Sequence, residues 1–152
     1  MNNKTRILLV DDEPLLLESL NLILSMEKDF KVVGTASDGV QALELLKKHK
    51  ADIALVDLRM VGMGGLQLIS EIRRLYKIMK ILVLTTFYDE KSIVTAILNG
   101  ADGYILKDAG RSAIVNAVRS AAKGQSTLDM KVMAALSAYV GKTKKTESVE
   151  KE

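Results

Sequence analysis

Residues 6–14 are Arg-Ile-Leu-Leu-Val-Asp-Asp-Glu-Pro, an apolar run that stops at two carboxylates and a proline. Such a run predicts a buried strand, and Pro14 suits the first turn of a following helix. Three more apolar runs end in the same way: Ile53–Val56 precedes Asp57, Lys80–Leu84 precedes Thr85, and Gly103–Leu106 precedes Lys107. Polar groups at the ends of buried strands must find partners or stay in water, so we expect these side chains to form one site.

Strand and helix patterns alternate along the chain. The predicted strands are Arg6–Val10, Lys31–Ala36, Ile53–Asp57, Lys80–Thr85 and Gly103–Leu106. The predicted helices start at Pro14 and Asp38 and span 66–75, 89–99 and 111–123, with apolar residues at helical spacing. Parallel strands need crossover helices, and uniformly apolar runs indicate strands buried on both faces. We predict an α/β fold with a doubly wound five-stranded parallel sheet, flanked by five helices, whose ligand site lies at the carboxyl ends of the strands.

Composition excludes several classes of protein. A chain of 152 residues with 48% hydrophobic content predicts one compact domain plus a short appendage. The absence of cysteine excludes disulfide frameworks, cysteine-ligated zinc and thiol catalysis. Apolar stretches far below the ~20 residues needed to cross a bilayer, and no signal-peptide pattern, predict a cytoplasmic protein without a membrane partner. A net charge of +3, spread in mixed-sign blocks, does not suggest nucleic-acid binding by this segment.

The predicted site has the chemistry of a magnesium-dependent phosphoryl acceptor. Mg²⁺ prefers oxygen ligands, which Asp12 and Asp57 would supply with Asp11 in support; Mn²⁺ is the alternative ion. A carboxylate can act as the nucleophile, and negative charge then spreads over the phosphoryl oxygens in the transition state. Lys107 and the Thr85 hydroxyl would each bind one such oxygen. Because clustered carboxylates repel one another, we expect at least one raised pKa and stabilisation of the fold by Mg²⁺.

Four motifs at these strand ends resemble the receiver domains of two-component response regulators. They are Leu-Val-Asp-Asp-Glu-Pro at 9–14, Leu-Val-Asp-Leu-Arg-Met at 55–60, Val-Leu-Thr-Thr at 83–86 and Gly-Tyr-Ile-Leu-Lys-Asp at 103–108. The resemblance covers about residues 5–124 and implies a flavodoxin-like strand order, 2-1-3-4-5. It also implies that Asp57 accepts a phosphoryl group from a sensor histidine kinase. Asp11 and Asp12 would then form the acidic metal pocket, completed by the main-chain carbonyl of Arg59.

The same resemblance implies a switch. Thr85 and Lys107 would bind the phosphoryl group, and Tyr104 matches an aromatic residue that turns inward as the threonine moves toward the phosphate. The surface that changes would be residues 89–123. Phosphorylation and dephosphorylation would be self-catalysed, so the domain would act as a switch and not as a turnover enzyme.

Each of these residues also has an ordinary structural interpretation when taken alone. Asp11 and Asp12 could form a turn with a helix N-cap, and Thr85 could cap the helix that follows it. Lys107 could be a solvated loop lysine, and Tyr104 a half-buried core residue. The four motifs in order favour the site over these separate interpretations.

Two features of the loops depart from the family's pattern or vary within it. Val61 and Gly64 stand where many relatives have proline and aspartate, which predicts a more mobile loop. Arg59 and Phe87 stand at positions that tune the lifetime of the phosphate in the family.

We place a receiver domain at residues 1–124 and a linker helix with a charged tail at 125–152. Leu128, Val132, Leu136 and Val140 recur every four residues, which predicts an amphipathic helix. Its apolar stripe needs a partner: the receiver, a second chain or a further domain. From Gly141 the segment is charged without an apolar period, which predicts a linker or disordered tail.

Residues 124–129 resemble the linker of NarL/LuxR-type regulators, in which a DNA-binding module follows. The hypothesis is a transcription regulator that contacts DNA only through a C-terminal domain absent from this chain, with homodimerisation on phosphorylation through residues 89–123 or the 128–140 helix. One alternative is a stand-alone receiver that acts through protein contacts or a phosphorelay. Another is a phosphatase of the haloacid dehalogenase type, which Asp11-Asp12-Glu13 disfavours because that family has Asp-x-Asp.

Overall fold

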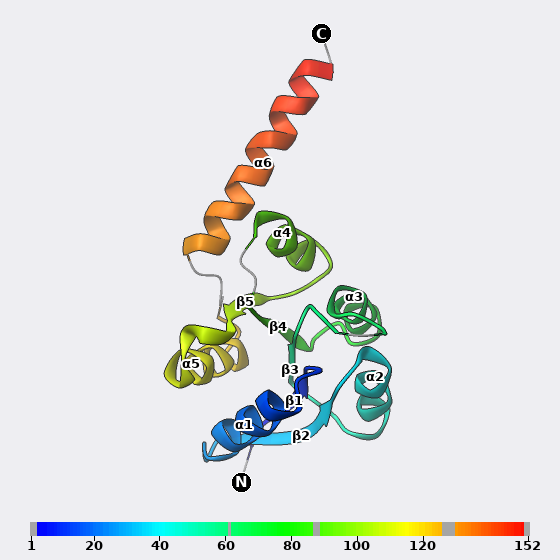
Figure 1. Ribbon diagram of the computed structural model, residues 1–152, viewed down its shortest axis with the longest axis vertical. Helices are drawn as coiled ribbons and strands as arrows, with labels where there is room; N and C mark the ends of the chain where they lie inside the picture. Colours follow the sequence, from blue (N-terminus) through cyan, green and yellow to red (C-terminus); the bar gives the residue numbers. More distant parts are fainter. Residues whose placement is uncertain (1–2, 61, 87–88, 126–129, 151–152) are drawn as a thin grey trace.

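The structure is a computed structural model that describes residues 3–60, 62–86, 89–125 and 130–150. Five parallel strands form one sheet in the order β2-β1-β3-β4-β5, which confirms the predicted topology (Figure 1). The strands are β1 Thr5–Val10, β2 Phe30–Ala36, β3 Ile53–Val56, β4 Lys80–Thr85 and β5 Gly103–Leu106. The helices are α1 Pro14–Ser25, α2 Gly39–Lys48, α3 Gly65–Leu75, α4 Glu90–Leu98, α5 Arg111–Ala122 and α6 Met130–Glu150, with a short 3-10 turn η1 at Lys107–Ala109.

Side chains of the central strands alternate between two apolar cores. Ile7 and Leu9 of β1 face one cluster, which also contains residues of α1 and α5. Leu8 and Val10 face the other, with residues of α2, α3 and α4. Helices therefore cover both faces of the sheet, as Figure 1 shows, and all four residues are at most 2% exposed. Burial on both faces explains why β3 is apolar throughout, why β1 is apolar after Arg6 and why β4 is apolar between its ends.

Most element boundaries agree with the sequence prediction to within a residue or two, and the differences lie at the helix and strand ends. The third strand ends at Val56, so Asp57 lies just beyond it. The helix predicted over 89–99 spans Glu90–Leu98, because Asp89 is its N-cap and accepts a hydrogen bond from the main-chain N–H of Ser92. Pro14 occupies the first turn of α1, as predicted.

The C-terminal segment differs from the prediction in its length. The helix that begins at Met130 continues to Glu150, through the charged residues predicted to lack structure. Lysine and glutamate are good helix formers even where no apolar stripe supports them, and Lys142 pairs with Glu90 of α4 at 3.0 Å. Leu128, the first residue of the predicted stripe, lies outside the described residues.

Helix α6 finds its partner on the receiver itself. Val132 is fully buried, and Ala135 is 9% exposed, within the same apolar cluster as Ile93 and Ala96 of α4. Figure 1 shows α6 lying over α4 and then extending beyond the rest of the molecule. Among the described residues, no helix combines the length and apolar character required to span a membrane.

Candidate functional site

Strand register brings the polar strand-end residues together at one edge of the sheet. Val10 of β1 pairs with Val56 of β3, so Asp11 and Asp57 follow neighbouring strands at the same level. The main-chain N–H of Asp57 donates to the carbonyl of Val10 at 2.9 Å, which continues the ladder by one residue. Thr85 of β4 pairs with Leu106 of β5, so Lys107 follows immediately beside it. The four runs identified in the sequence therefore end at one site.

Lys107 lies at the centre of this cluster. Its Nζ is 2.8 Å from Asp11 Oδ2 and 3.4 Å from Asp57 Oδ2, and its side chain is only 9% exposed. A third carboxylate, that of Glu13, lies 3.2 Å from the same Nζ at the solvent-exposed rim. One ammonium thus neutralises part of a buried acidic group, and Lys107 is not a solvated loop lysine.

The pKa values of the cluster reflect burial and like charge. Burial first, and then the negative charge of Asp11, raises the pKa of Asp57 from 3.8 to about 6. The charge of Lys107 and a hydrogen bond from the main-chain N–H of Arg59 oppose that rise. Burial alone would lower the pKa of Lys107, but the hydrogen bond to Asp11 and the charge of Asp57 raise it overall. Asp57 is therefore a carboxylate whose ionised form needs additional positive charge.

The acidic group can hold a cation. Asp11, Asp12 and Asp57 each offer a carboxylate oxygen, and these oxygens lie within 4.8 Å of one another. Asp11 and Asp57 are buried, while Asp12 is partly open to solvent. A hard divalent cation prefers carboxylate oxygens and keeps some of its water, so the donor set and the partial opening both suit such an ion. Because burial and the charge of Asp11 raise the pKa of Asp57, a cation bound here would favour its ionised form.

Thr85 and Tyr104 occupy adjacent strands behind this cluster. Thr85 ends β4 and is fully buried, and Tyr104 of β5 is 1% exposed. Tyr104 packs within the core cluster that also contains Ile93 of α4 and Val132 of α6. Burial, with smaller contributions from the charges of Asp89 and Asp57, raises the pKa of Tyr104. The ring is therefore buried and lies within electrostatic reach of Asp57.

The turn interpretation holds in part for Asp11, whereas the capping interpretation of Thr85 does not hold. Glu13 is the N-cap of α1 and makes no side-chain capping bond, while its main-chain N–H donates to Asp11 Oδ1 at 2.9 Å. Asp89, and not Thr85, caps α4. Glu13 is the member of the site that sequence reasoning missed, and its position directly after Asp11 and Asp12 was the available signal.

The loop after β3 fixes the main chain of Asp57. A Cβ at Gly65 would collide with the main-chain atoms of Asp57 and Leu58, so only glycine allows α3 to begin this close to the acidic residue. Gly64 is different, because its φ of −75° is ordinary and its Cβ would have the Leu58 carbonyl 3.9 Å away as nearest neighbour. Val61 and Phe87, which figured in the sequence predictions, lie outside the described residues.

A family assignment follows from the motifs and from this geometry. The family model described as the response regulator receiver domain matches residues 7–119. The chain belongs to this family. The match contains the acidic strand end after β1, Asp57, Thr85 and Lys107, and it ends within α5.

Known relatives of this receiver domain are transcription regulators of the NarL type, the type that residues 124–129 resemble. The transcriptional regulatory protein NarL of Mycobacterium tuberculosis (strain CDC 1551 / Oshkosh) is 42% identical over 126 residues, which are 82% of this chain and 58% of that protein. The nitrate/nitrite response regulator protein NarL of Escherichia coli (strain K12) is 39% identical over 122 residues, 80% of this chain and 56% of that protein. This chain therefore spans little more than half the length of these curated relatives.

A solved structure agrees with the sequence comparison. The signal receiver domain of the response regulator NarL from Mycobacterium tuberculosis superposes with a TM-score of 0.76 and 40% sequence identity. The match covers 81% of this chain and 99% of that chain. The likeness thus extends over one whole receiver domain.

Proposed function

We propose that this receiver domain is a switch controlled by phosphorylation of Asp57. A carboxylate oxygen of Asp57 attacks the phosphorus of a phosphohistidine on a sensor histidine kinase, a new P–O bond forms, and the P–N bond breaks as the imidazole leaves with a proton. The observation that carries the proposal is the position of the Asp57 carboxylate, which lies beside Asp11 and 3.4 Å from the Lys107 ammonium. Phosphoryl transfer needs this kind of positioning and charge neutralisation more than covalent chemistry by the protein.

The carboxylates of Asp11, Asp12 and Asp57, with the main-chain carbonyl of Arg59, would hold Mg²⁺, or Mn²⁺ in its place. When bound, the ion supplies positive charge to the phosphoryl oxygens. We expect millimolar Mg²⁺ to raise the melting temperature of the chain, since its charge offsets the burial and the repulsion from Asp11 that together raise the pKa of Asp57. Asp12→Asn removes one ligand and should reduce the rise, so an equal rise in both proteins would contradict this set of ligands.

The remaining residues would convert the phosphoryl group into a change of surface. The Lys107 ammonium and the Thr85 hydroxyl bind phosphoryl oxygens, and Tyr104 responds to the position of Thr85. The burial of Tyr104 in one cluster with Ile93 and Val132 supports a route from the site to α4 and α6. Residues 89–123 would then be the surface that differs between the two states and controls output.

The same residues would let the domain modify itself with a small phosphodonor and later hydrolyse the aspartyl phosphate. Incubation with acetyl phosphate and Mg²⁺, followed by intact-mass analysis, should add one phosphoryl group to the wild type. Asp57→Asn should gain none, and Glu71→Gln, a change on the solvent-exposed side of α3, is the matched control that should still be phosphorylated. Phosphorylation of Asp57→Asn would overturn the assignment of the acceptor.

The output that we propose is control of transcription through a DNA-binding domain of a longer protein, with homodimerisation in the phosphorylated state. The support is the similarity to NarL-type regulators, of which this chain matches 56–58% of the length. Sedimentation with and without beryllofluoride and Mg²⁺ tests the dimer: an increase in mass is expected, and an unchanged monomer would remove that part of the proposal.

A further inference from the structure

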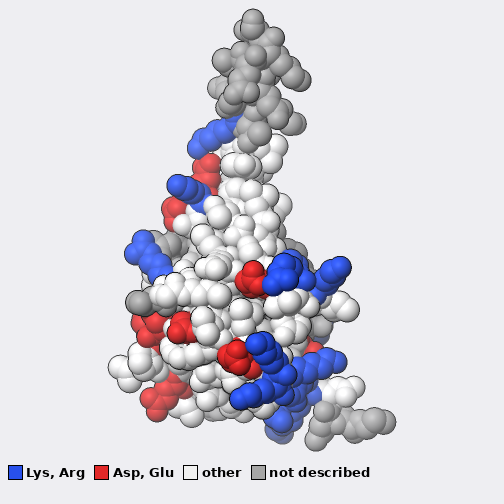
Figure 2. All heavy atoms as spheres, turned by 90° about the vertical axis from the view of Figure 1, so that its right-hand side faces the viewer, with Lys and Arg blue, Asp and Glu red and all other residues white. Residues whose placement is uncertain are grey.

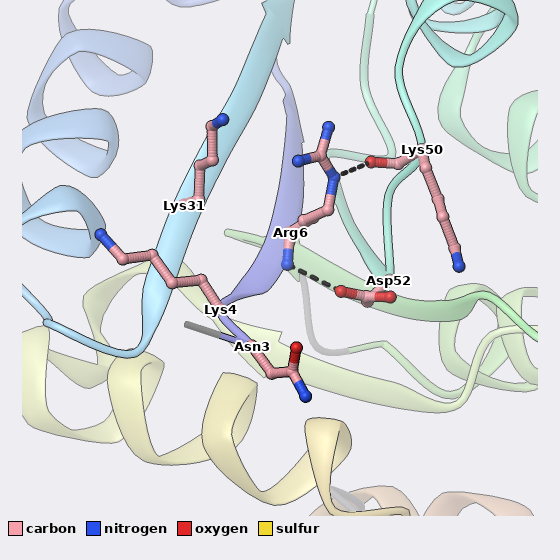
Figure 3. Close-up of a pocket in the computed structure, with 6 residues that line it drawn as sticks. All are labelled: Asn3, Lys4, Arg6, Lys31, Lys50 and Asp52. Atoms are coloured by element: carbon pink, nitrogen blue, oxygen red, sulfur yellow. Dashed lines mark hydrogen bonds between the residues drawn. The ribbon is translucent and has the colours of Figure 1, made fainter. Parts of the chain in front are cut away.

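The edge of the sheet opposite the acidic cluster is basic and hollowed. An open depression of about 680 Å³ lies where β1, β2 and β3 begin, and Figure 3 shows its lining: Asn3, Lys4, Arg6, Lys31, Lys50 and Asp52. The Arg6 side chain is fixed there, because its Nε donates to the carbonyl of Lys50 at 2.6 Å. The cationic groups in Figure 3 stand around the depression and do not converge on one point. This arrangement suits an extended anionic partner better than a single small anion.

A second hollow adjoins the first and is mainly apolar. It encloses about 440 Å³ between the C-terminal ends of α2 and α3, and its apolar lining includes Leu46, Ala51, Tyr76 and Met79. Ile78 is 89% exposed at its margin. Four cationic residues also line it, namely Lys47, Lys48, Lys50 and Lys77, and Lys50 belongs to both hollows. We call the two hollows together the basic edge.

Charge at the basic edge is poorly compensated. Asp52 is the one acidic residue among the described residues that line the two hollows, and its carboxylate accepts a hydrogen bond from the main-chain N–H of Arg6 at 2.8 Å. Lys47 pairs with Glu44 at 3.2 Å on the open surface. Within the described ranges, no ion pair engages Lys48, Lys50 or Lys77. Figure 2 shows Lys and Arg side chains gathered over the lower part of the molecule. A net charge of only +3 for the chain is thus unevenly distributed.

We propose that the basic edge is a docking surface for an acidic segment of a partner protein, which places one apolar side chain in the hollow between α2 and α3. The cations provide electrostatic complementarity for Asp and Glu side chains, and the apolar hollow provides a site for one anchor residue. A nucleic-acid backbone would leave that hollow unfilled. A flat anionic membrane could contact the cations but would not enter either hollow. The surface lies at the amino ends of the strands, so docking leaves Asp57 accessible.

The test uses a labelled peptide of glutamates with one central leucine, and a second peptide in which serine replaces the leucine. The leucine peptide should bind the intact chain, and the serine peptide should bind about tenfold more weakly, since the anchor's burial is lost. Lys48→Glu/Lys77→Glu should also weaken binding of the leucine peptide by about tenfold or more. Ile78→Ser should weaken it several-fold. All three substitutions change exposed side chains, and melting temperatures will show whether the variants fold.

The control with the same change of charge is Lys91→Glu/Lys123→Glu, on exposed positions of α4 and after α5, which should leave binding within about twofold. In spectra of the ¹⁵N-labelled chain, the peptide should shift signals of residues 46–52 and 76–80. Equal weakening by the control variant, equal binding of the two peptides, or shifts centred elsewhere would overturn the proposal. So would tighter binding, at the same edge, to phosphatidylserine vesicles, to duplex DNA or to a second copy of the chain.

Discussion

The negative charge of Asp57 is only partly compensated by its surroundings. Its carboxylate is buried beside Asp11, and the single ammonium of Lys107 is shared among three acidic side chains. A fully compensated carboxylate would have a lowered pKa, whereas the pKa of Asp57 rises to about 6. Ionisation of Asp57 therefore destabilises the folded domain. A bound cation or a covalent modification of the carboxylate can remove this destabilisation. That property suits a residue whose state must change.

Asp57→Asn should stabilise the fold at neutral pH. The pKa of Asp57 is higher in the folded state than in the unfolded state, where it is 3.8. Ionisation of Asp57 therefore does not destabilise the fold below pH 3.8, and its destabilising effect is fully present above about pH 6. A rise of the pKa from 3.8 to about 6 corresponds to about 3 kcal/mol in the free energy of unfolding. Asparagine resembles the protonated form of aspartate, so the variant avoids this loss. Urea unfolding of both proteins without divalent cations should show a gain of up to about 3 kcal/mol above pH 6, which disappears below pH 3.8.

Asp29→Asn is the matched control with the opposite sign. The hydrogen bond from Arg119 lowers the pKa of Asp29, so its contribution to stability is present at neutral pH and lost as the solution is acidified. The variant should be less stable than the wild type at neutral pH. A gain for Asp57→Asn that did not depend on pH would show that packing, and not ionisation, causes it.

The residues of the site were predictable because each interrupts an apolar run. Asp11, Asp57, Thr85 and Lys107 stand at strand ends, and parallel strands bring such ends to one edge. Glu13 was not predictable in this way, since it is the last of three acidic residues and does not directly follow a strand. Its contact with Lys107 depends on the direction in which α1 begins after β1. The raised pKa of one carboxylate was expected, but which carboxylate it would be depended on burial.

At the scale of elements, the start of α3 controls the site, and two neighbouring glycines there have opposite requirements. Gly65→Ala forces the main chain of Asp57 and Leu58 to move, so it should lower the free energy of unfolding by about 2 kcal/mol and slow phosphorylation by acetyl phosphate. Gly64→Asp meets open space and adds an N-cap side chain to α3, so it should raise that free energy by about 0.5 kcal/mol. Urea unfolding and the mass assay measure both effects.

Comparable effects of the two substitutions would contradict this account, since a Cβ at Gly65 meets main-chain atoms whereas one at Gly64 has room and the aspartate there adds a cap. The sequence suggested that Gly64 loosens the loop. The structure gives it ordinary φ and ψ angles, so aspartate fits there as well as glycine does.

One arginine joins the C-terminal end of α3 to the loops that precede β4 and β5. Arg73 donates to the carbonyls of Gly100, Lys77 and Met79 and pairs with Asp102 at 2.7 Å. Arg73→Met keeps the stem but leaves these acceptors without their donor, so it should lower the free energy of unfolding by about 2 kcal/mol. Arg74→Met is the control, because among the described residues Arg74 pairs with Glu71 alone, at the surface, and the change should alter stability by less than about 0.5 kcal/mol. Thermal and urea unfolding measure both.

Equal losses for the two arginines would refute the distinction. In the sequence the two arginines look alike, since both lie in the last turn of a helix, where the helix dipole favours cations. Periodicity predicts which face of a helix is buried, but it does not predict which loops contact the helix end. The bond to Gly100 links residues far apart in the chain and appears only once the sheet has assembled.

For the whole molecule, the largest difference from the sequence prediction is the length of the C-terminal helix. An apolar stripe over 128–140 was visible in the sequence, but its partner and its end were not. The partner is α4, through the fully buried Val132, and the helix continues to Glu150 without an apolar stripe to support it. An apolar period detects only those parts of a helix that bury one face, so it could not indicate that the helix continues through the charged residues after Gly141.

We expect α6 to respond to the state of Asp57, because its anchor Val132 packs in the same cluster as Tyr104. Helices in water without tertiary contacts are marginal, so protection of α6 amides from hydrogen exchange should depend on its docking to α4. Val132→Ser should raise exchange rates throughout α6, while Val140→Ser, at a position that is 50% exposed on the same helix, should not. Because Val132 shares a cluster with Tyr104, beryllofluoride with Mg²⁺ should also change α6 exchange in the wild type but not in Asp57→Asn. Equal exchange in α6 with and without beryllofluoride would contradict this expectation. If the cluster around Tyr104 repacks, the contacts of Val132 must change, and the protection of α6 should change with them.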